Sequence, residues 1–288
     1  MTQKICVLRI EGTNCEYETY LSFIRLGAAA EIVHLKQLIG AVQLQDQRHL
    51  QDYGALVIPG GFSSGDYIRA GAILAARIKG ALGAEITEFI AAEKPILGIC
   101  NGFQVLVEMG LLPGFGMPEG GEEAVQQAAL TTNDSGRFEC RPTLIKHENG
   151  GSCVFTRGIE RGGILKIPCA HAEGKFFIDE HRRADYLQRL EEHDQIVFRY
   201  VDPAGDYAGY PWNPNGSLAN IAGICNPAGT ILGLMPHPER AFYAFMDAEW
   251  PRAAQVRTPA MVTGGGTQAY GDGQKIFASI LKYLRSRG

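Results

Sequence analysis

The segment KPILGICNGFQVLVEMG, residues 94–110, passes from a strand-like to a helix-like pattern at a single cysteine. The apolar run Pro95–Ile99 predicts a short buried strand. The apolar residues that follow recur at helical spacing: Phe103, Val105, Leu106 and Met109. Gly110 supplies a helix stop. Cys100 is therefore expected at a strand-to-helix corner.

Glycines stand two positions before and two positions after this cysteine, as a tight turn requires. A Cβ at Gly98 or Gly102 would collide with the crossing backbone. A cysteine in such a corner projects off the sheet beside the free N–H groups of the following helix, which stabilise a thiolate. The alternative is an inert packing cysteine, because cysteine is among the most buried residue types. The G-x-C-x-G pattern alone leaves both interpretations open.

The sequence before this segment alternates strands and helices. Apolar strands are expected at Ile5–Ile10, Glu31–Leu35 and Ala55–Ile58. Helical patterns are expected at 69–80 and 84–93. An earlier helix places four residues on its apolar face: Tyr20, Phe23, Ile24 and Leu26. The alternation predicts an α/β fold in which helices flank a mostly parallel sheet.

Beyond residue 140 the pattern changes to short strands separated by Gly, Pro, Asn and Asp, namely LIKH, ILKIPCAH, KFFID, IVFRYVD, NIAGIC and TILGLM. The last two are joined by a hairpin-like link at Asn226–Gly229. Because no linker-like stretch divides the chain, we expect one domain, 1–288, with an added antiparallel section. Its extended C-terminal segment, 242–288, is expected to end in a helix. The stretches 115–127 and 254–273 are expected to be surface loops.

The chain has 288 residues, 45% hydrophobic and 20% charged, with a formal net charge of −4. This charge, without a Lys/Arg block, argues against a nucleic-acid partner. Arg9 and Glu11 come too early for a signal-peptide core, and no apolar stretch approaches the length of a membrane span. Seven cysteines without a C-x-x-C pair predict reduced thiols, no structural zinc site and a cytoplasmic location.

A cysteine nucleophile needs a base, and a group that orients the base. His237 lies in LMPHPER, directly after a predicted strand, and its two neighbouring prolines stiffen the backbone. An extended backbone would return Glu239 to the same side as His237. The remaining histidines with polar or strand-edge surroundings are expected at the surface: His34, His49, His147, His181 and His193.

An acyl intermediate also needs donors for its oxyanion. The backbone N–H of Asn101 follows the cysteine directly, and a second donor is expected from the turn Gly60–Phe62 after the preceding strand. The alternative for this turn is a purely structural role.

Together, PGG after a strand, then GICNGFQ, then PHPE, resemble the class I, triad-type glutamine amidotransferases. Further stretches resemble the glutaminase subunits of phosphoribosylformylglycinamidine synthases: EGTNCE, PGGFSSGDYIRAGAI, GICNGFQVLVEMGLLPG, AHAEGKF, NPNGS, IAGICNPAG and GLMPHPER. The resemblance is most specific over 55–113 and 164–241, and weak in 115–163 and 242–270. It implies a flavodoxin-like sheet. Ala172 departs from the glycine of the family's A-H-G-E-G, which leaves the role of His171 open.

The resemblance implies a catalytic triad. Cys100 would be the nucleophile, His237 the general base and acid, and Glu239 the residue that orients the imidazole. Oxyanion donors would come from the backbone of Gly61 and Asn101.

It also implies contacts with bound glutamine at Gly60, Phe62 and Gln104. Cys15 is the one rival nucleophile, since it too lies in a loop after a strand. It lacks flanking glycines and an evident partner, so it is expected to be structural or near a subunit interface.

The implied function is hydrolysis of glutamine to glutamate and ammonia through a thioester. The ammonia would pass to a synthetase subunit that makes formylglycinamidine ribonucleotide in purine biosynthesis, with a small accessory subunit in the same complex. No G-x-x-x-x-G-K-[ST] motif occurs in the chain, so ATP and Mg²⁺ are expected on the synthetase subunit and no cofactor or metal here. The alternatives are a free-standing cysteine amidase of the same fold and a non-catalytic regulatory subunit.

Overall fold

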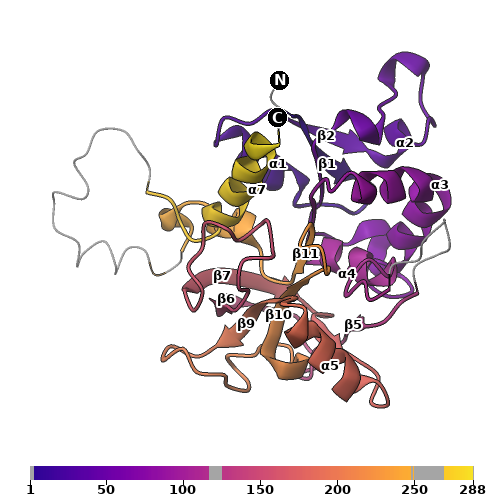
Figure 1. Cartoon of the computed structure of the whole chain (residues 1–288). Coiled ribbons are helices and arrows are strands. Elements are labelled where there is room, and N and C mark those ends of the chain that lie inside the picture. The colour runs from indigo at the N-terminus through magenta and orange to yellow at the C-terminus, as the bar shows by residue number, and fades with distance from the viewer. Residues whose placement is uncertain (1–2, 117–124, 248, 250–268, 288) are drawn as a thin grey trace.

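A mixed sheet runs through the centre of the molecule (Figure 1). The computed structural model describes residues 3–116, 125–247, 249 and 269–287. In these ranges the strand order is β2-β1-β3-β4-β11-β10-β9-β6-β7. The strands are β1 (Ile5–Arg9), β2 (Ala30–His34), β3 (Ala55–Ile58), β4 (Ile96–Ile99), β6 (Glu139–His147), β7 (Ile164–His171), β9 (Ile196–Val201), β10 (Ile221–Cys225) and β11 (Ile231–Leu234).

The sheet changes character at β11. The neighbours from β2 to β11 are all parallel, whereas β11, β10, β9, β6 and β7 pair antiparallel. Parallel strands buried on both faces consist of nearly continuous apolar residues, as ALVI of β3 and ILGI of β4 do. The α/β fold class with an added antiparallel section is therefore confirmed. The predicted hairpin is present as well, because β10 and β11 are joined by a turn in which Gly229 N–H donates to Asn226 O.

Helices cover both faces of the parallel section. α1 (Glu16–Ile24) and α7 (Gln274–Ser286) lie on one side, and α3 (Ala72–Ala91) and α4 (Asn101–Glu108) on the other (Figure 1). Phe23 of α1 and Phe277 of α7 make an edge-to-face contact with ring centroids 5.1 Å apart. The shorter helices are α2 (Leu35–Leu38) and α5 (Arg183–Glu192). Within the described ranges, no helix is long and apolar enough to cross a membrane.

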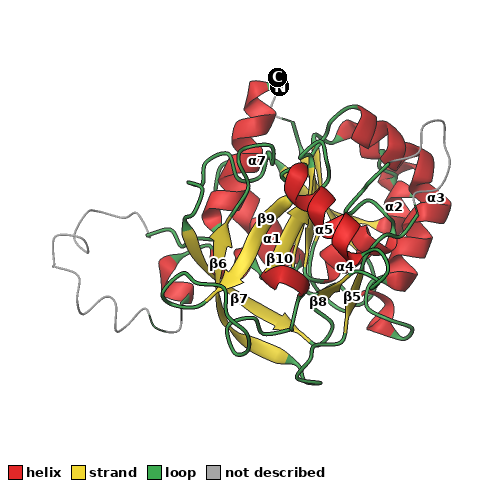
Figure 2. Ribbon diagram, turned by 60° about the horizontal axis from the view of Figure 1, so that its bottom comes forward, coloured by secondary structure: helices red, strands yellow, loops and turns green. Residues whose placement is uncertain are grey.

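A second, two-stranded sheet lies beside α4 (Figure 2). It pairs β5 (Ala129–Thr131) with β8 (Lys175–Phe177) antiparallel. The Phe103 ring of α4 stacks on Phe176 of β8 with centroids 6.4 Å apart. The expected strand in KFFID is therefore present but pairs outside the main sheet.

One continuous helix replaces the two helical patterns expected at 69–80 and 84–93. α3 runs through Gly80 and Gly83, where an added Cβ would meet nothing within 4 Å. Its buried residues recur every three or four positions: Leu74, Ala75, Ile78, Leu82, Ile86 and Phe89. Burial of this unbroken stripe outweighs the cost of about 1 kcal/mol for each helical glycine.

Two sequence expectations fall partly outside the described residues. The central part of the 115–127 stretch, 117–124, and most of the 254–273 stretch, 254–268, are not described. The predicted C-terminal helix is α7. Just before it, Tyr270 forms a β-bridge with Tyr243, which connects the two described ends of this segment.

Candidate active site

Cys100 occupies a strained corner between β4 and α4. Its backbone has φ 50° and ψ −106°, a conformation that costs free energy for a residue with a side chain. A Cβ on Gly98 would lie 2.6 Å from the Gly102 carbonyl oxygen, and one on Gly102 would lie 1.9 Å from the Ile58 carbonyl oxygen. The predicted corner, and its need for both glycines, are confirmed.

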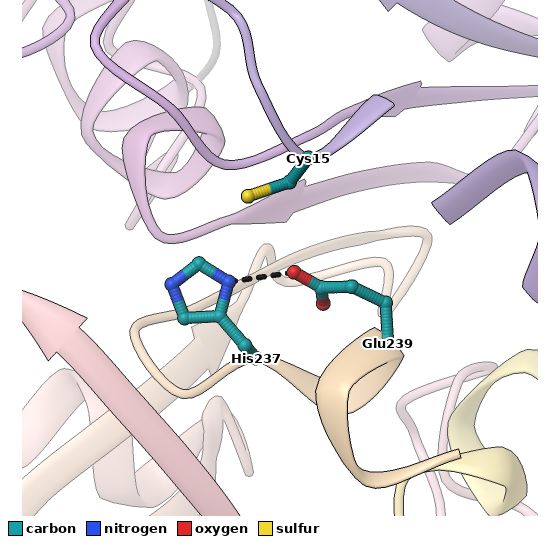
Figure 3. A group of neighbouring side chains, drawn as sticks. All are labelled: Cys15, His237 and Glu239. Atoms are coloured by element: carbon teal, nitrogen blue, oxygen red, sulfur yellow. Dashed lines mark hydrogen bonds and ion pairs between the residues drawn. The ribbon is translucent and has the colours of Figure 1, made fainter. Parts of the chain in front are cut away.

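His237 and Glu239 form a buried pair after β11 (Figure 3). His237 Nδ1 lies 2.6 Å from Glu239 Oε1, and the main-chain N–H of His237 donates to Pro168 O at 2.8 Å. The backbone is extended at His237, but Pro238–Ala241 form a 3₁₀ helix. The expected extended path to Glu239 is therefore wrong. The helical turn, which proline at its first position favours, returns the carboxylate to the imidazole.

The sheet order explains why these groups meet. β1, β3, β4 and β11 are parallel and adjacent, so the segments that follow them all leave from the same edge. Cys100 follows β4, His237 follows β11, and the glycine turn Gly60–Gly61 follows β3. Cys15 lies in the loop after β1.

The imidazole of His237 is perturbed by burial and by the charges around it. Burial disfavours its charged form, but the negative charges of Glu239 and of the Cys100 thiolate outweigh burial and raise the pKa of His237 well above its ordinary value. Nε2 has no hydrogen-bond partner among the groups that the structure describes. The Cys100 Sγ lies 3.6 Å from Ala170 O. This charge pattern suits a thiolate–imidazolium pair.

Two of the backbone donors expected for an oxyanion have no acceptor among the described residues. In the described chain, no group accepts a hydrogen bond from the N–H of Gly61 or of Asn101, the first residue of α4. Gly61 has φ +150°, and a Cβ there would lie 2.9 Å from Gly12 O. The N–H of Phe62, by contrast, donates to Gly12 O at 2.9 Å. Of the expected turn, Gly61 therefore has a free donor, whereas Phe62 does not.

The three residues expected to contact substrate lie in different surroundings. Gly60 packs against the imidazole, because a Cβ there would lie 2.7 Å from His237 Cε1. Phe62 is half exposed, with its ring 6.4 Å from that of Phe138. Gln104 is buried, and its side-chain amide forms hydrogen bonds with other groups of the protein.

The contacts of Gln104 connect two parts of the site. Its side-chain nitrogen donates to Glu173 O, and its oxygen accepts from Asn101 Nδ2 at 2.9 Å. The side chain thus ties α4 to the segment after β7.

The expectation that Cys15 lacks a partner is wrong. Arg240 Nη2 donates to Cys15 Sγ at 3.1 Å, and the thiol also interacts with the His237 ring. Burial raises the pKa of the Cys15 thiol, and His237 opposes this effect. The sequence did carry a signal, since a loop after β1 must reach the same sheet edge as the loop after a neighbouring parallel β3.

Two further histidines are buried. Burial and the positive charge of His237 lower the pKa of His171 to about 4, and its Nδ1 lies 3.2 Å from Asn133 Oδ1. His147 was expected at the surface, but it is buried with its ring 5.7 Å from Phe198. It occupies an inward position in the alternating pattern of β6, which pairs on both sides and so has no open edge.

The fold, together with a Cys, a His and a Glu at one edge of its parallel section, defines a glutamine amidotransferase of the triad class. The chain matches the family of CobB/CobQ-like glutamine amidotransferase domains over residues 2–284. It is 53% identical to the phosphoribosylformylglycinamidine synthase subunit PurQ of Archaeoglobus fulgidus, over 98% of this chain and 97% of that protein. It is 39% identical to the PurQ subunit of Methanothrix thermoacetophila, over 99% of both chains. The chain belongs to the PurQ family of phosphoribosylformylglycinamidine synthase subunits.

Solved structures agree with this assignment. A chain in the structure of PurLQS from Thermotoga maritima is similar with a TM-score of 0.68 and 32% identity, covering 99% of this chain and 100% of that one. A glutamine amidotransferase of Thermotoga maritima shares the fold with a TM-score of 0.50 at 17% identity, covering 100% of this chain and 98% of that one.

Proposed function

We propose that this chain hydrolyses glutamine to glutamate and ammonia at Cys100, and that the ammonia serves a synthetase subunit that makes formylglycinamidine ribonucleotide. The observation that carries the proposal is the strained corner of Cys100 beside the buried His237–Glu239 pair. The 53% identity to a PurQ subunit supports the pathway.

The reaction begins with attack of the Cys100 thiolate on the side-chain amide carbon of glutamine, which forms an S–C bond and an oxyanion. The free N–H groups of Gly61 and Asn101 donate to that oxyanion. His237 protonates the amide nitrogen, the C–N bond breaks and ammonia leaves.

Hydrolysis of the thioester follows. His237 takes a proton from water, the hydroxide attacks the thioester carbon, and the C–S bond breaks to give glutamate and the Cys100 thiolate. Glu239 keeps the imidazole aligned through Nδ1 and stabilises its charged form.

Glutamine would lie against the turn Gly60–Phe62. The buried amide of Gln104 would hold the wall opposite that turn through its bonds to Asn101 and Glu173. We infer that residues 1–288 act as one amidotransferase domain, which the single main sheet supports.

The acceptor chemistry belongs to partners. The sequence lacks a P-loop motif, and a similar chain occurs in a structure described as PurLQS. We place ATP and Mg²⁺ on a synthetase subunit, add a small accessory subunit to the complex, and locate the assembly in the cytoplasm.

An electrophilic glutamine analogue tests the nucleophile. Peptide mapping after labelling should find the analogue on Cys100, and Cys100→Ala should abolish glutamate release while thermal unfolding stays cooperative. Cys140→Ala is the matched control, because Cys140 is exposed, and it should behave as wild type. Attachment of the label to Cys15 would contradict the assignment. Glutamate release that never depends on a synthetase subunit would favour the free-standing amidase.

A further inference from the structure

A second thiol stands beside the catalytic pair. Cys15 is buried in the loop between β1 and α1, and its Sγ points toward His237 and Glu239 (Figure 3). One ligand-type atom from each of the three residues lies within 4.8 Å of the other two. Two polar atoms of the cluster, His237 Nε2 and Glu239 Oε2, are buried and have no hydrogen-bond partner in the part of the chain that the structure describes.

The carboxylate contacts Nδ1 of the imidazole, and the thiol borders the same small space as Nδ1. A Cβ on Gly60 would lie 3.2 Å from Cys15 Sγ and 3.3 Å from His237 Nδ1, so these two atoms border one small space. Glu239 Oε1 lies 2.6 Å from the same Nδ1. The cluster therefore converges on Nδ1 and leaves Nε2 for the reaction.

Thiolate, imidazole and carboxylate are the ligands that Zn²⁺ takes in proteins. Three protein ligands with water in the fourth position form a common open zinc site. Thiolate and carboxylate together carry two negative charges, which match the divalent ion. The Arg240 guanidinium, 3.1 Å from Cys15 Sγ, stabilises the thiolate that a metal requires.

We propose that Cys15, His237 and Glu239 form an inhibitory site for Zn²⁺. The inhibition rests on the proposed role of His237, whereas the binding itself does not. This site differs from the structural zinc site that the cysteine spacing argues against, because it uses one cysteine and two residues of the triad.

Binding would remove the general base by releasing a proton. As Zn²⁺ binds Nδ1 and displaces the hydrogen bond to Glu239, the imidazolium loses its Nδ1 proton to solvent and keeps the proton on Nε2. Nε2 can then no longer accept a proton from Cys100 or water. The Cys15 thiol loses its own proton to solvent as the S–Zn bond forms.

Access for the ion has a structural basis. A cavity of about 470 Å³ is lined by Arg240, Pro168, Tyr243 and Cys140 among others. Arg240 lines this cavity and also donates to Cys15 Sγ, so the cavity reaches a side chain that contacts the thiol.

Zinc binding is tested on the full chain without any activity measurement. Competition with a chromogenic chelator should find one Zn²⁺ per wild-type chain, and Co²⁺ should give a thiolate charge-transfer band. Cys15→Ser should weaken binding by more than about 100-fold, since even outer-shell partners of a metal contribute about 10–100-fold. Cys140→Ser is the matched control, as an exposed thiol of the cavity, and Cys100→Ala should also keep the ion.

A second readout uses the unmodified chain. Zn²⁺ should protect Cys15, but not Cys140, from slow alkylation mapped by mass spectrometry. Equal affinity in the wild type and Cys15→Ser, or loss of binding in Cys100→Ala with retention in Cys15→Ser, would overturn the site.

Activity then tests the inhibition. Zn²⁺ should suppress glutamate release by the wild type, and a chelator should restore it. The ratio of rates with and without Zn²⁺ should approach one for Cys15→Ser, whatever its own rate. Cys15-dependent binding in a chain that never hydrolyses glutamine would leave the metal site standing and refute the proposed function. Glutaminase activity that Zn²⁺ does not affect would refute the inhibition alone.

Discussion

The imidazole of His237 contacts Glu239 through one ring nitrogen, and the other has no hydrogen-bond partner among the described residues. This difference between the two nitrogens sets the expected mutational pattern. His237→Asn should lower kcat by about 10²–10⁴-fold, because it removes proton transfer to the leaving ammonia. Glu239→Gln should lower kcat less, since Glu239 only aligns the imidazole and stabilises its charged form. Rates of glutamate release for both variants and the double variant measure this.

Residues that act as one unit have non-additive effects. The double variant should therefore be little slower than His237→Asn alone. Penalties that multiply would show that Glu239 acts independently of His237.

His171 predicts a pH dependence of stability. Its pKa is about 4 in the folded protein and about 6.5 in an unfolded chain. Between these values the unfolded state binds more protons at His171, so the contribution of His171 to stability rises with pH from about 4 to 6.5 and is constant above. The pKa difference corresponds to about 3 kcal/mol.

Chemical unfolding at a series of pH values measures this slope. His171→Asn keeps a donor near the position of Nδ1 and should flatten the slope, whatever its effect at pH 7. His193→Asn is the control, because His193 is exposed, and it should keep the wild-type slope. An unchanged slope in His171→Asn would assign the acid sensitivity to other groups.

At the scale of elements, the close packing of α4 on β3 depends on one missing side chain. A Cβ on Gly102 would lie 1.9 Å from the Ile58 carbonyl oxygen, a backbone atom that cannot rotate away. Gly102→Ala should destabilise the protein by about 1–3 kcal/mol and displace the Cys100 corner.

Gly80→Ala is the matched control with the opposite sign. Gly80 lies in α3 with open space at its Cβ position, so alanine there should stabilise by about 0.5–1 kcal/mol. Denaturant unfolding of both variants compares them. A neutral Gly102→Ala would mean that α4 can shift away from β3 without cost.

The elements also show what local sequence can and cannot predict. The β4–α4 corner was predictable, because strand, glycines and helix follow each other within residues 94–110. The continuity of α3 was not predictable from local sequence. The free energy gained by burying its apolar stripe against neighbouring elements outweighs the helix cost of its two glycines. The burial of His147 could be predicted only with knowledge of which face of β6 turns inward.

Some contacts of the candidate site could likewise be predicted from local sequence, and others could not. His237 and Glu239 are two residues apart, so their contact was predictable even though the 3₁₀ turn was not. Cys15 and His237 are 222 residues apart in the sequence. Only the strand order β1-β3-β4-β11 brings them to one edge, and strand order depends on long-range pairing that no local pattern contains.

At the scale of the whole molecule, the glycine turn connects the site to an exposed surface. The turn is fastened to the N-terminal loop through Phe62 N–H to Gly12 O and Ser64 N–H to Glu11 O, at 2.9 and 2.8 Å. Directly after it, Tyr67 is 88% exposed and Ile68 is 74% exposed. We expect these two side chains to belong to a contact surface for another protein, because contiguous exposed apolar surface marks such sites. Because Tyr67 and Ile68 are only a few residues from the turn, a partner that covers them could change the conformation of the turn.

This connection predicts control by the synthetase subunit. Ammonia released to neutral water is protonated and lost to the acceptor reaction. The sequence has no P-loop motif, so we expect the signal that the acceptor reaction is ready to come from the synthetase subunit. We expect the isolated chain to be a poor glutaminase. Docking need only aim the free N–H of Gly61 at the oxyanion, and one such donor contributes about 10²–10³-fold to turnover. Glycine permits the peptide rotation at small cost.

The measurement is glutamate release by the purified chain, with and without the synthetase subunit and its nucleotide ligands. Partner addition should raise turnover by about 10²–10³-fold. The double variant Tyr67→Ser, Ile68→Ser should lose this activation, because the partner is expected to act on the turn Gly60–Phe62 through these two exposed side chains. Leu44→Ser is the matched control: Leu44 is 82% exposed but lies outside that segment, so its variant should be activated normally. Full-speed hydrolysis by the lone chain would reject the gating. Activation that survives in the Tyr67/Ile68 variant would place the partner's contact with the turn elsewhere.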